Sequence, residues 1–192
     1  TYKLDLIRAE CAALNGDIDK AENIYQVLMR EVNSDLERAQ LCLNQLLFFF
    51  GQGKWEKAIT IGEKGLSFCG LSVPKTEQLL ELALADTEHQ LAYELGKTPI
   101  SRIHQLPEMQ NPIEQVAMSL LVNMGLCNMV IGNKLYLKLY TQQALILTFM
   151  HGKTDLSALV LAIYAYSKGV DEQFQQAVEA AEQALSIMET YP

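Results

Sequence analysis

Two Gly-Lys-Thr tripeptides come nearest to a known chemical motif in this chain. They are Gly96-Lys97-Thr98 and Gly152-Lys153-Thr154, and the phosphate-binding loop of many nucleotide-binding proteins contains the same Gly-Lys-Thr. That loop needs a further glycine five positions earlier, so that successive backbone N–H groups can surround the phosphates. Leucine stands there in both cases, at Leu91 and Leu147. We therefore interpret both tripeptides as helix C-caps, where lysine faces the negative end of the helix dipole.

Histidine and cysteine are the other residue types that could do chemistry, as metal ligands or nucleophiles. The histidines show no metal-site spacing, and the cysteines form no CxxC pair; they are His89, His104, His151, Cys11, Cys42, Cys69 and Cys127. Each cysteine lies in an apolar helical pattern, which indicates free thiols in a reducing, cytoplasmic compartment. We assign no catalytic, cofactor-binding or metal-binding residue, and we expect this segment not to be an enzyme.

The composition is that of a folded domain with no affinity for nucleic acid. Apolar residues make up 49% of the 192 residues, which is enough for a substantial core. The net charge of −8 disfavours contact with a phosphate backbone. The 19 residues from Gln115 to Asn133 carry no charge, a length that could span a bilayer. Ser119, Asn123 and Asn128 lower their hydrophobicity, so we predict a buried helix and no membrane insertion.

Hydrophobic periodicity predicts an all-α protein, because no segment alternates with the period of a strand. We expect one continuous helical domain in three parts: two helical hairpins in residues 1–70, a long helix and a proline-containing connector in 71–112, and two further hairpins in 113–192. Ser34 and Glu37 form a predicted capping box at the start of one helix. Individual helices are predicted at 2–14, 17–32, 76–95, 134–151, 156–166 and 171–191, and the segment 156–166 is apolar nearly all round and expected in mid-layer.

The first two hairpins repeat with a fixed period. Gly16 and Gly53 are 37 residues apart, and so are Ala21 and Ala58. A period in the thirties with a glycine-containing turn is typical of helical repeat arrays. The matching residues resemble the tetratricopeptide repeat (TPR); they are Gly16, Ile18, Ala21 and Tyr25, then Gly53, Trp55, Ala58 and Gly62, with a third partial match at Phe174, Ala177, Ala181 and Ala184. The resemblance implies TPR-like antiparallel hairpins stacked into a right-handed superhelical array.

A second resemblance covers nearly the whole chain. It rests on three groups of residues: Gly70, Leu71 and Pro74; then Ile103, Leu106, Pro107, Met109, Pro112, Ala117, Leu120 and Leu121; then Gly152, Ser157, Ala158 and Tyr164. The pattern is similar to the helical region of very large bacterial signalling kinases that are abundant in cyanobacteria. In that family a serine/threonine-kinase domain is followed by an AAA-type ATPase domain, this helical region, a GAF sensor and a histidine-kinase module.

The resemblance implies a non-catalytic protein-interaction or regulatory scaffold within a multidomain signal-transduction protein kinase. Its partner would be another domain of the parent chain or a separate signalling protein, and the 192 residues would be a fragment of a larger protein. The alternative is a free-standing TPR adaptor that binds a peptide or protein. The length of the natural open reading frame separates the two hypotheses.

Charge is distributed unevenly along the chain. Residues 1–98 hold 25 charged side chains and residues 99–192 hold 13, with Lys134 and Lys138 alone between Gln115 and Gly152. Helices with so few charges must be covered by their own chain, by a second copy, or by parent domains. We therefore expect self-association, or an exposed apolar patch that contains Met129, Leu135 and Leu139.

Overall fold

The computed structural model describes residues 2–189, with the side chains of Tyr2 and Lys3 left out. Within these residues the chain is helical and has no strand, so the predicted all-α class is confirmed. The elements are α1 (Tyr2–Leu14), α2 (Ile18–Glu31), α3 (Asp35–Gly51), α4 (Trp55–Phe68), α5 (Glu77–Lys97), the 3-10 helix η1 (Ile100–Gln105), α6 (Pro112–Val130), α7 (Lys134–His151), α8 (Ser157–Val170) and α9 (Phe174–Met188). The last helix begins three residues after the predicted Asp171, and its predicted end at Tyr191 lies outside the described residues.

Local sequence fixes several helix ends. The Ser34 side chain accepts a hydrogen bond from the Glu37 N–H at 3.2 Å, and the Glu37 carboxylate accepts one from the Ser34 N–H at 3.3 Å. The predicted capping box is therefore present. Asn111 caps α6, and Pro112 occupies its first turn, where the missing N–H has no intrahelical partner to lose.

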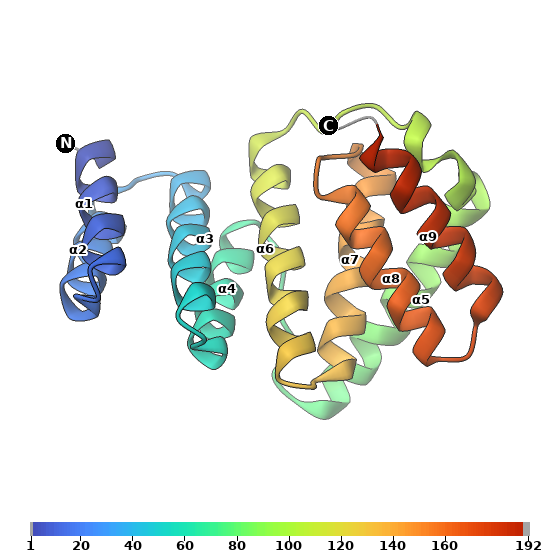
Figure 1. The fold of residues 1–192 in the computed structure, drawn as a ribbon, viewed down its shortest axis with the longest axis horizontal. Helices are drawn as coiled ribbons and strands as arrows, with labels where there is room; N and C mark the ends of the chain where they lie inside the picture. Colours follow the sequence, from blue (N-terminus) through green and yellow to red (C-terminus); the bar gives the residue numbers. More distant parts are fainter. Residues whose placement is uncertain (1, 190–192) are drawn as a thin grey trace.

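Neighbouring helices pack in pairs, α1 with α2, α3 with α4, α6 with α7, and α8 with α9 (Figure 1). The pairs are joined by further contacts between helices distant in sequence. Helix α6 packs against both α3 and α4, α5 packs against α7, and η1 packs against α9. The three-part division of the chain remains a prediction, because these contacts link the parts without marking their boundaries.

Helices α3, α4 and α6 meet at two glycines of α4. A Cβ atom added to Gly62 would lie 2.1 Å from the Met124 sulfur and 2.7 Å from a Leu46 methyl carbon. One added to Gly65 would lie 2.9 Å from the Cys42 Cβ. Only a residue without a side chain allows this approach, so glycine at both positions permits the close contact of α4 with α3 and α6.

Helix α5 explains why α7 carries so few charges. Leu80 and Leu84 of α5 cluster with Leu139 of α7, and all three side chains are buried. Helix α6 is long and apolar enough to cross a membrane by length and composition, but 56% of that window is buried inside the protein. One such helix, largely buried, is weak evidence for a membrane span. The low charge of both helices follows from cover by the same chain.

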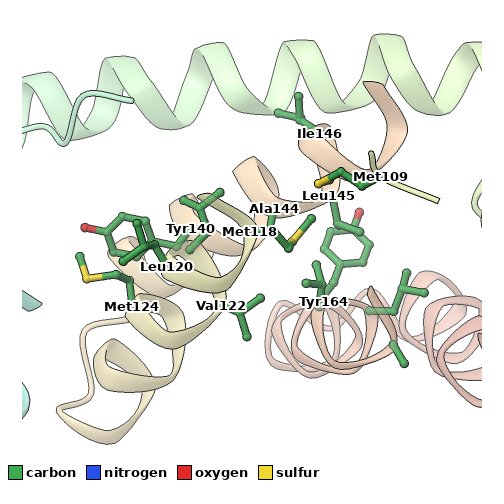
Figure 2. Close-up of a cluster of buried hydrophobic side chains, with 14 of the residues drawn as sticks. Met109, Met118, Leu120, Val122, Met124, Tyr140, Ala144, Leu145, Ile146 and Tyr164 are labelled. Carbon is green, nitrogen blue, oxygen red and sulfur yellow. The ribbon is translucent and has the colours of Figure 1, made fainter. Parts of the chain in front are cut away.

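The main core extends from α3 to α9, and Figure 2 shows part of it around α6, α7 and α8. Met118 and Met124 come from α6, Tyr140 and Leu145 from α7, and Tyr164 from α8. Met109 from the connector reaches the same cluster and is 2% exposed. The connector is therefore part of the core, although it contains no α-helix.

Two expectations about these helices are wrong. Gly96 does not follow α5, which continues through Lys97 and ends at Thr98 in an extended conformation. The reason is Pro99, which disfavours a helical conformation in the residue before it. Helix α8 is not buried all round, because Leu159, Tyr166 and Val170 lie on an exposed side.

Candidate protein-binding face

The second Gly-Lys-Thr tripeptide is bonded to the connector. The Met109 N–H donates to the Lys153 carbonyl and the Lys153 N–H donates to the Pro107 carbonyl, both at 2.8 Å. The Lys153 ammonium donates to the His104 carbonyl at 2.9 Å. Gly152 ends α7 with φ +108°, and an added Cβ would lie 2.4 Å from the Pro107 oxygen. The Lys153 N–H, which a phosphate would require, already has a partner, and the predicted C-cap is confirmed here.

The first Gly-Lys-Thr tripeptide, at residues 96–98, also makes its contacts within the fold. The Lys97 ammonium pairs with the Glu94 carboxylate at 2.9 Å and lies 3.9 Å from the centre of the Tyr93 ring. The Glu94 side chain is buried. This lysine therefore stabilises the end of α5.

Histidines and cysteines are not gathered into a site within residues 2–189. No group of three or more His, Cys, Asp or Glu in this range could hold a metal ion. His151 Nδ1 lies 2.9 Å from the Glu114 carboxylate and joins the end of α7 to the start of α6. Burial raises the pKa of the Cys42 and Cys127 thiols to about 11, which disfavours the reactive thiolate. Cys11 is exposed and Cys69 partly so.

An apolar cleft opens where the α6–α7 turn meets the end of α8. We call it the α7–α8 cleft; its volume is about 290 Å³, and its lining residues are Asn128, Met129, Gly132, Lys134, Leu135, Leu137, Lys138, Tyr166, Ser167, Val170 and Asp171. The geometry follows from short elements. Gly132 turns the chain with φ +77°, and Asn133 caps α7 through the Tyr136 N–H. The turn thus brings Met129 and Leu135 into the same cleft as Tyr166.

Four large apolar side chains of the cleft are open to solvent, whereas Leu137 is buried. Met129 is 41%, Leu135 47%, Tyr166 55% and Val170 47% exposed. The sequence-based expectation of an exposed patch is confirmed for Met129 and Leu135. It is wrong for Leu139, which lies one turn further along α7 on the side that α5 covers.

Lysines border the cleft and interact with neighbouring groups. The Lys138 ammonium lies 2.5 Å from the Glu88 carboxylate of α5, and this hydrogen bond lowers the pKa of Glu88. Lys168 donates to the Gln173 amide oxygen at 2.8 Å. Burial lowers the pKa of Lys168, and the positive charge of Lys138 lowers it further. The cleft is thus lined by charges of both signs, Lys134, Lys138 and Asp171, and Lys138 is neutralised by its pairing with Glu88.

Sequence reasoning missed the α8 side of this surface. Tyr166 and Val170 belong to a helix whose composition indicated complete burial. The signal that could have found them is spacing: the exposed residues of α8 recur at intervals of three and four. Their regular recurrence marks one side of the helix, and that side faces solvent.

No protein-family model matches the sequence, and no curated protein matches it. The arrangement described above is therefore the basis for a functional interpretation. It consists of a helical scaffold, a Gly-Lys-Thr segment bonded within the fold, and an open apolar cleft bordered by lysines.

Proposed function

We propose that this chain is a non-catalytic protein-interaction and regulatory scaffold region of a multidomain signal-transduction protein kinase. In this proposal the helical pairs are TPR-like hairpins of a right-handed superhelical array, and the parent protein acts in the cytoplasm. The partner is another domain of the parent chain or a separate signalling protein. The catalytic activity of the parent resides in domains outside the 192 residues.

The observation that carries the proposal is the α7–α8 cleft. Three of its apolar side chains, Leu135, Tyr166 and Val170, are about half exposed and come from two different helices. A grouping of large apolar residues on a surface usually marks an interface with protein or membrane. Exposed aromatic residues beside aliphatic ones, with a polar rim, are typical of protein interfaces.

A second observation supports the kinase resemblance. The segments that carry it lie 45 residues apart in sequence, at Pro107 and Gly152, and they are in direct contact. Beside that contact the Met109 N–H donates to the Lys153 carbonyl, and the Lys153 N–H donates to the Pro107 carbonyl. The two parts of the shared sequence pattern thus contact each other in the fold. The resemblance therefore concerns architecture, in keeping with a scaffold.

The natural full-length protein provides the test. Replacing Tyr166 with a photo-crosslinking phenylalanine derivative places the reactive group in the α7–α8 cleft. The same replacement at Tyr93, which is 64% exposed on α5, is the control. We expect strong crosslinking from position 166 to another domain of the parent chain or to a signalling protein. Equal yields at the two positions would contradict an interaction role for the cleft.

The natural open reading frame decides between the two forms of this proposal. A very long product with kinase, ATPase and sensor segments on either side of these residues would support the scaffold region. A product of about the length of a single small domain would support the free-standing adaptor instead.

A further inference from the structure

Helix α9 carries a second apolar surface. Its exposed residues Phe174, Val178, Ala181, Leu185 and Met188 recur at spacings of four, three, four and three. Phe174 and Leu185 are 66% and 63% exposed. This alternation is the spacing of a seam that packs against another helix. Over 15 residues the seam is about 22 Å long, at 1.5 Å per residue.

The exposed residues of α8 form a parallel stripe. They are Leu159, Ala162, Tyr166 and Val170, and the last two also line the α7–α8 cleft. Helices α8 and α9 pack against each other along their length (Figure 1). Whether their stripes form one surface depends on the direction in which each points.

Internal contacts show that both stripes point away from α5. Tyr164 of α8 and Gln176 of α9 line one cavity together with Leu95 of α5. Residues two positions apart on a helix point in nearly opposite directions, about 200° apart around the axis. Tyr166 is two positions after Tyr164, and Phe174 is two positions before Gln176. Both stripes therefore lie on the outer side of the α8–α9 pair, and we call this surface the α8–α9 face.

The fold already contains a helix seated on such a pair. Helix α6 packs against both α3 and α4. At this contact Gly62 of α4 lies next to Met124 of α6 and Leu46 of α3. Gly65 of α4 lies next to Leu120 of α6. A third helix lying against two paired helices is thus the way this chain covers an apolar pair. On the α8–α9 face the two helices are present and no third helix from residues 2–189 covers them.

The charged residues beside the seam indicate which kind of partner would fit. Residues 169–189 hold five acidic residues and no lysine or arginine. Glu182 and Glu189 are exposed and lie next to Leu185 on the helix surface, one three residues before it and one four after it. A second α9 would bring the same negative charges into contact, and an anionic membrane would also be repelled. A helix whose apolar seam is bordered by lysine or arginine matches both the apolar stripe of α9 and the acidic residues beside it.

We propose that the α8–α9 face binds an amphipathic helix whose apolar seam is bordered by lysine and arginine. This inference rests on the proposed interaction role and adds the chemical nature of the partner. The seam of the incoming helix would lie along Phe174, Val178 and Leu185. Its basic border would face Glu182 and Glu189, as charged positions beside a helical seam set partner choice in coiled coils.

Three synthetic peptides of about 20 residues test the proposal with the 192-residue chain. The first has leucine at the seam positions and lysine beside them. The second has glutamate in place of the lysines, and the third has the composition of the first in an order without a seam. We expect the first to bind at least about tenfold more tightly than either control. Its advantage over the glutamate peptide should shrink as salt rises from about 0.05 M to 0.5 M.

Variants locate the binding on α9. Leu185→Asp should weaken binding of the lysine peptide at least about tenfold. Leu82→Asp, at a leucine 56% exposed on α5, is the matched control and should leave binding unchanged. Glu182→Lys combined with Glu189→Lys should reverse the preference toward the glutamate peptide. Leu185 and Glu182 are exposed, so circular dichroism should show folded variants.

Several results would overturn the proposal. Equal binding of the lysine and scrambled peptides would mean general attraction to an acidic protein. Equal loss of binding in Leu185→Asp and Leu82→Asp would remove the site from α9. Self-association of the wild-type chain in sedimentation, abolished by Leu185→Asp, would make a second copy the occupant. Crosslinking at Tyr166 together with no peptide preference would leave the interaction role intact and refute the basic helix alone.

Discussion

Replacing Gly62 by alanine is the most direct test of how α3, α4 and α6 are held together. Alanine favours a helix interior over glycine by about 1 kcal/mol, so the change would stabilise an exposed helix. Here the added Cβ would lie 2.1 Å from the Met124 sulfur and 2.9 Å from the Met124 Cγ. Met124 is fully buried and has no solvent into which it could turn.

The expected result is a net loss of stability. Overpacking a filled core costs roughly 1–3 kcal/mol, which exceeds the gain in helix propensity. The net effect is a loss of about 1 kcal/mol, or about 2–4 °C in Tm for a domain of this size. Gly62→Trp and Ala58→Trp should be far more disruptive, because both positions are buried against neighbouring helices.

Gly169→Ala is the matched control. Gly169 also lies inside a helix, but nothing within 4 Å would meet its added Cβ. This variant should gain about 0.5–1 kcal/mol and melt at a higher temperature than the wild type. Thermal unfolding followed by circular dichroism compares the two substitutions directly.

A double-mutant cycle identifies the cause. In a Met124→Ala background the sulfur and the Cγ are absent, so Gly62→Ala should cost less than in the wild type. We expect a coupling free energy of about 0.5–3 kcal/mol between the two positions. If Gly62→Ala and Gly169→Ala raise Tm by the same amount, the close packing of α4 on α6 is refuted.

Four further outcomes are expected. Tyr140→Phe should raise stability by roughly 1 kcal/mol, because the buried Tyr140 hydroxyl has no hydrogen-bond partner among the described residues. Tyr136→Phe should lower stability, because it removes the 2.6 Å hydrogen bond from the Tyr136 hydroxyl to the Pro74 carbonyl. Chemical denaturation measures both changes. Gly152→Ala should lower Tm strongly, through its positive φ and its contact with the connector. ATP should leave Tm unchanged, and a saturable rise abolished by Lys153→Ala would contradict this. Burial, and to a smaller extent the negative charge of Glu10, raises the pKa of Tyr25 to about 12 in the folded state, from 10.0 for an unperturbed tyrosine. Between these two pH values the folded state keeps the phenol proton and the unfolded state loses it. Stability should therefore fall from pH 10 to 12, less steeply in Tyr25→Phe, as alkaline denaturation would show.

Sequence alone predicted the helical elements because their signals act over a few residues. The range Tyr2–Leu14 and the range Lys134–His151 agree with the predicted bounds. Ser34 and Glu37 bond within one turn, and Gly152 ends α7 where the sequence places it. Of the residues of the first repeat match that lie in α2, Ala21 and Tyr25 are buried and Ile18 is partly buried. Each of these features depends on neighbours at most four positions away.

Tertiary structure alone decided which apolar sides are covered. Leu135 and Leu139 are one turn apart on α7, yet the first is about half exposed and the second fully buried. The difference arises from α5, which begins nearly 60 residues earlier and packs on one side of α7. Nothing in the sequence around Leu139 specifies that neighbour.

The same reason explains α8 and the connector. The composition of α8 indicated burial on all sides, but no helix among residues 2–189 covers Tyr166 and Val170. Gly152 showed the signal of a helix end, and its contact with Pro107 became evident only in the fold. Helix formation depends on hydrogen bonds within a turn, so sequence determines it locally. Burial, and with it the candidate binding face, depends on which distant element arrives at each side of a helix.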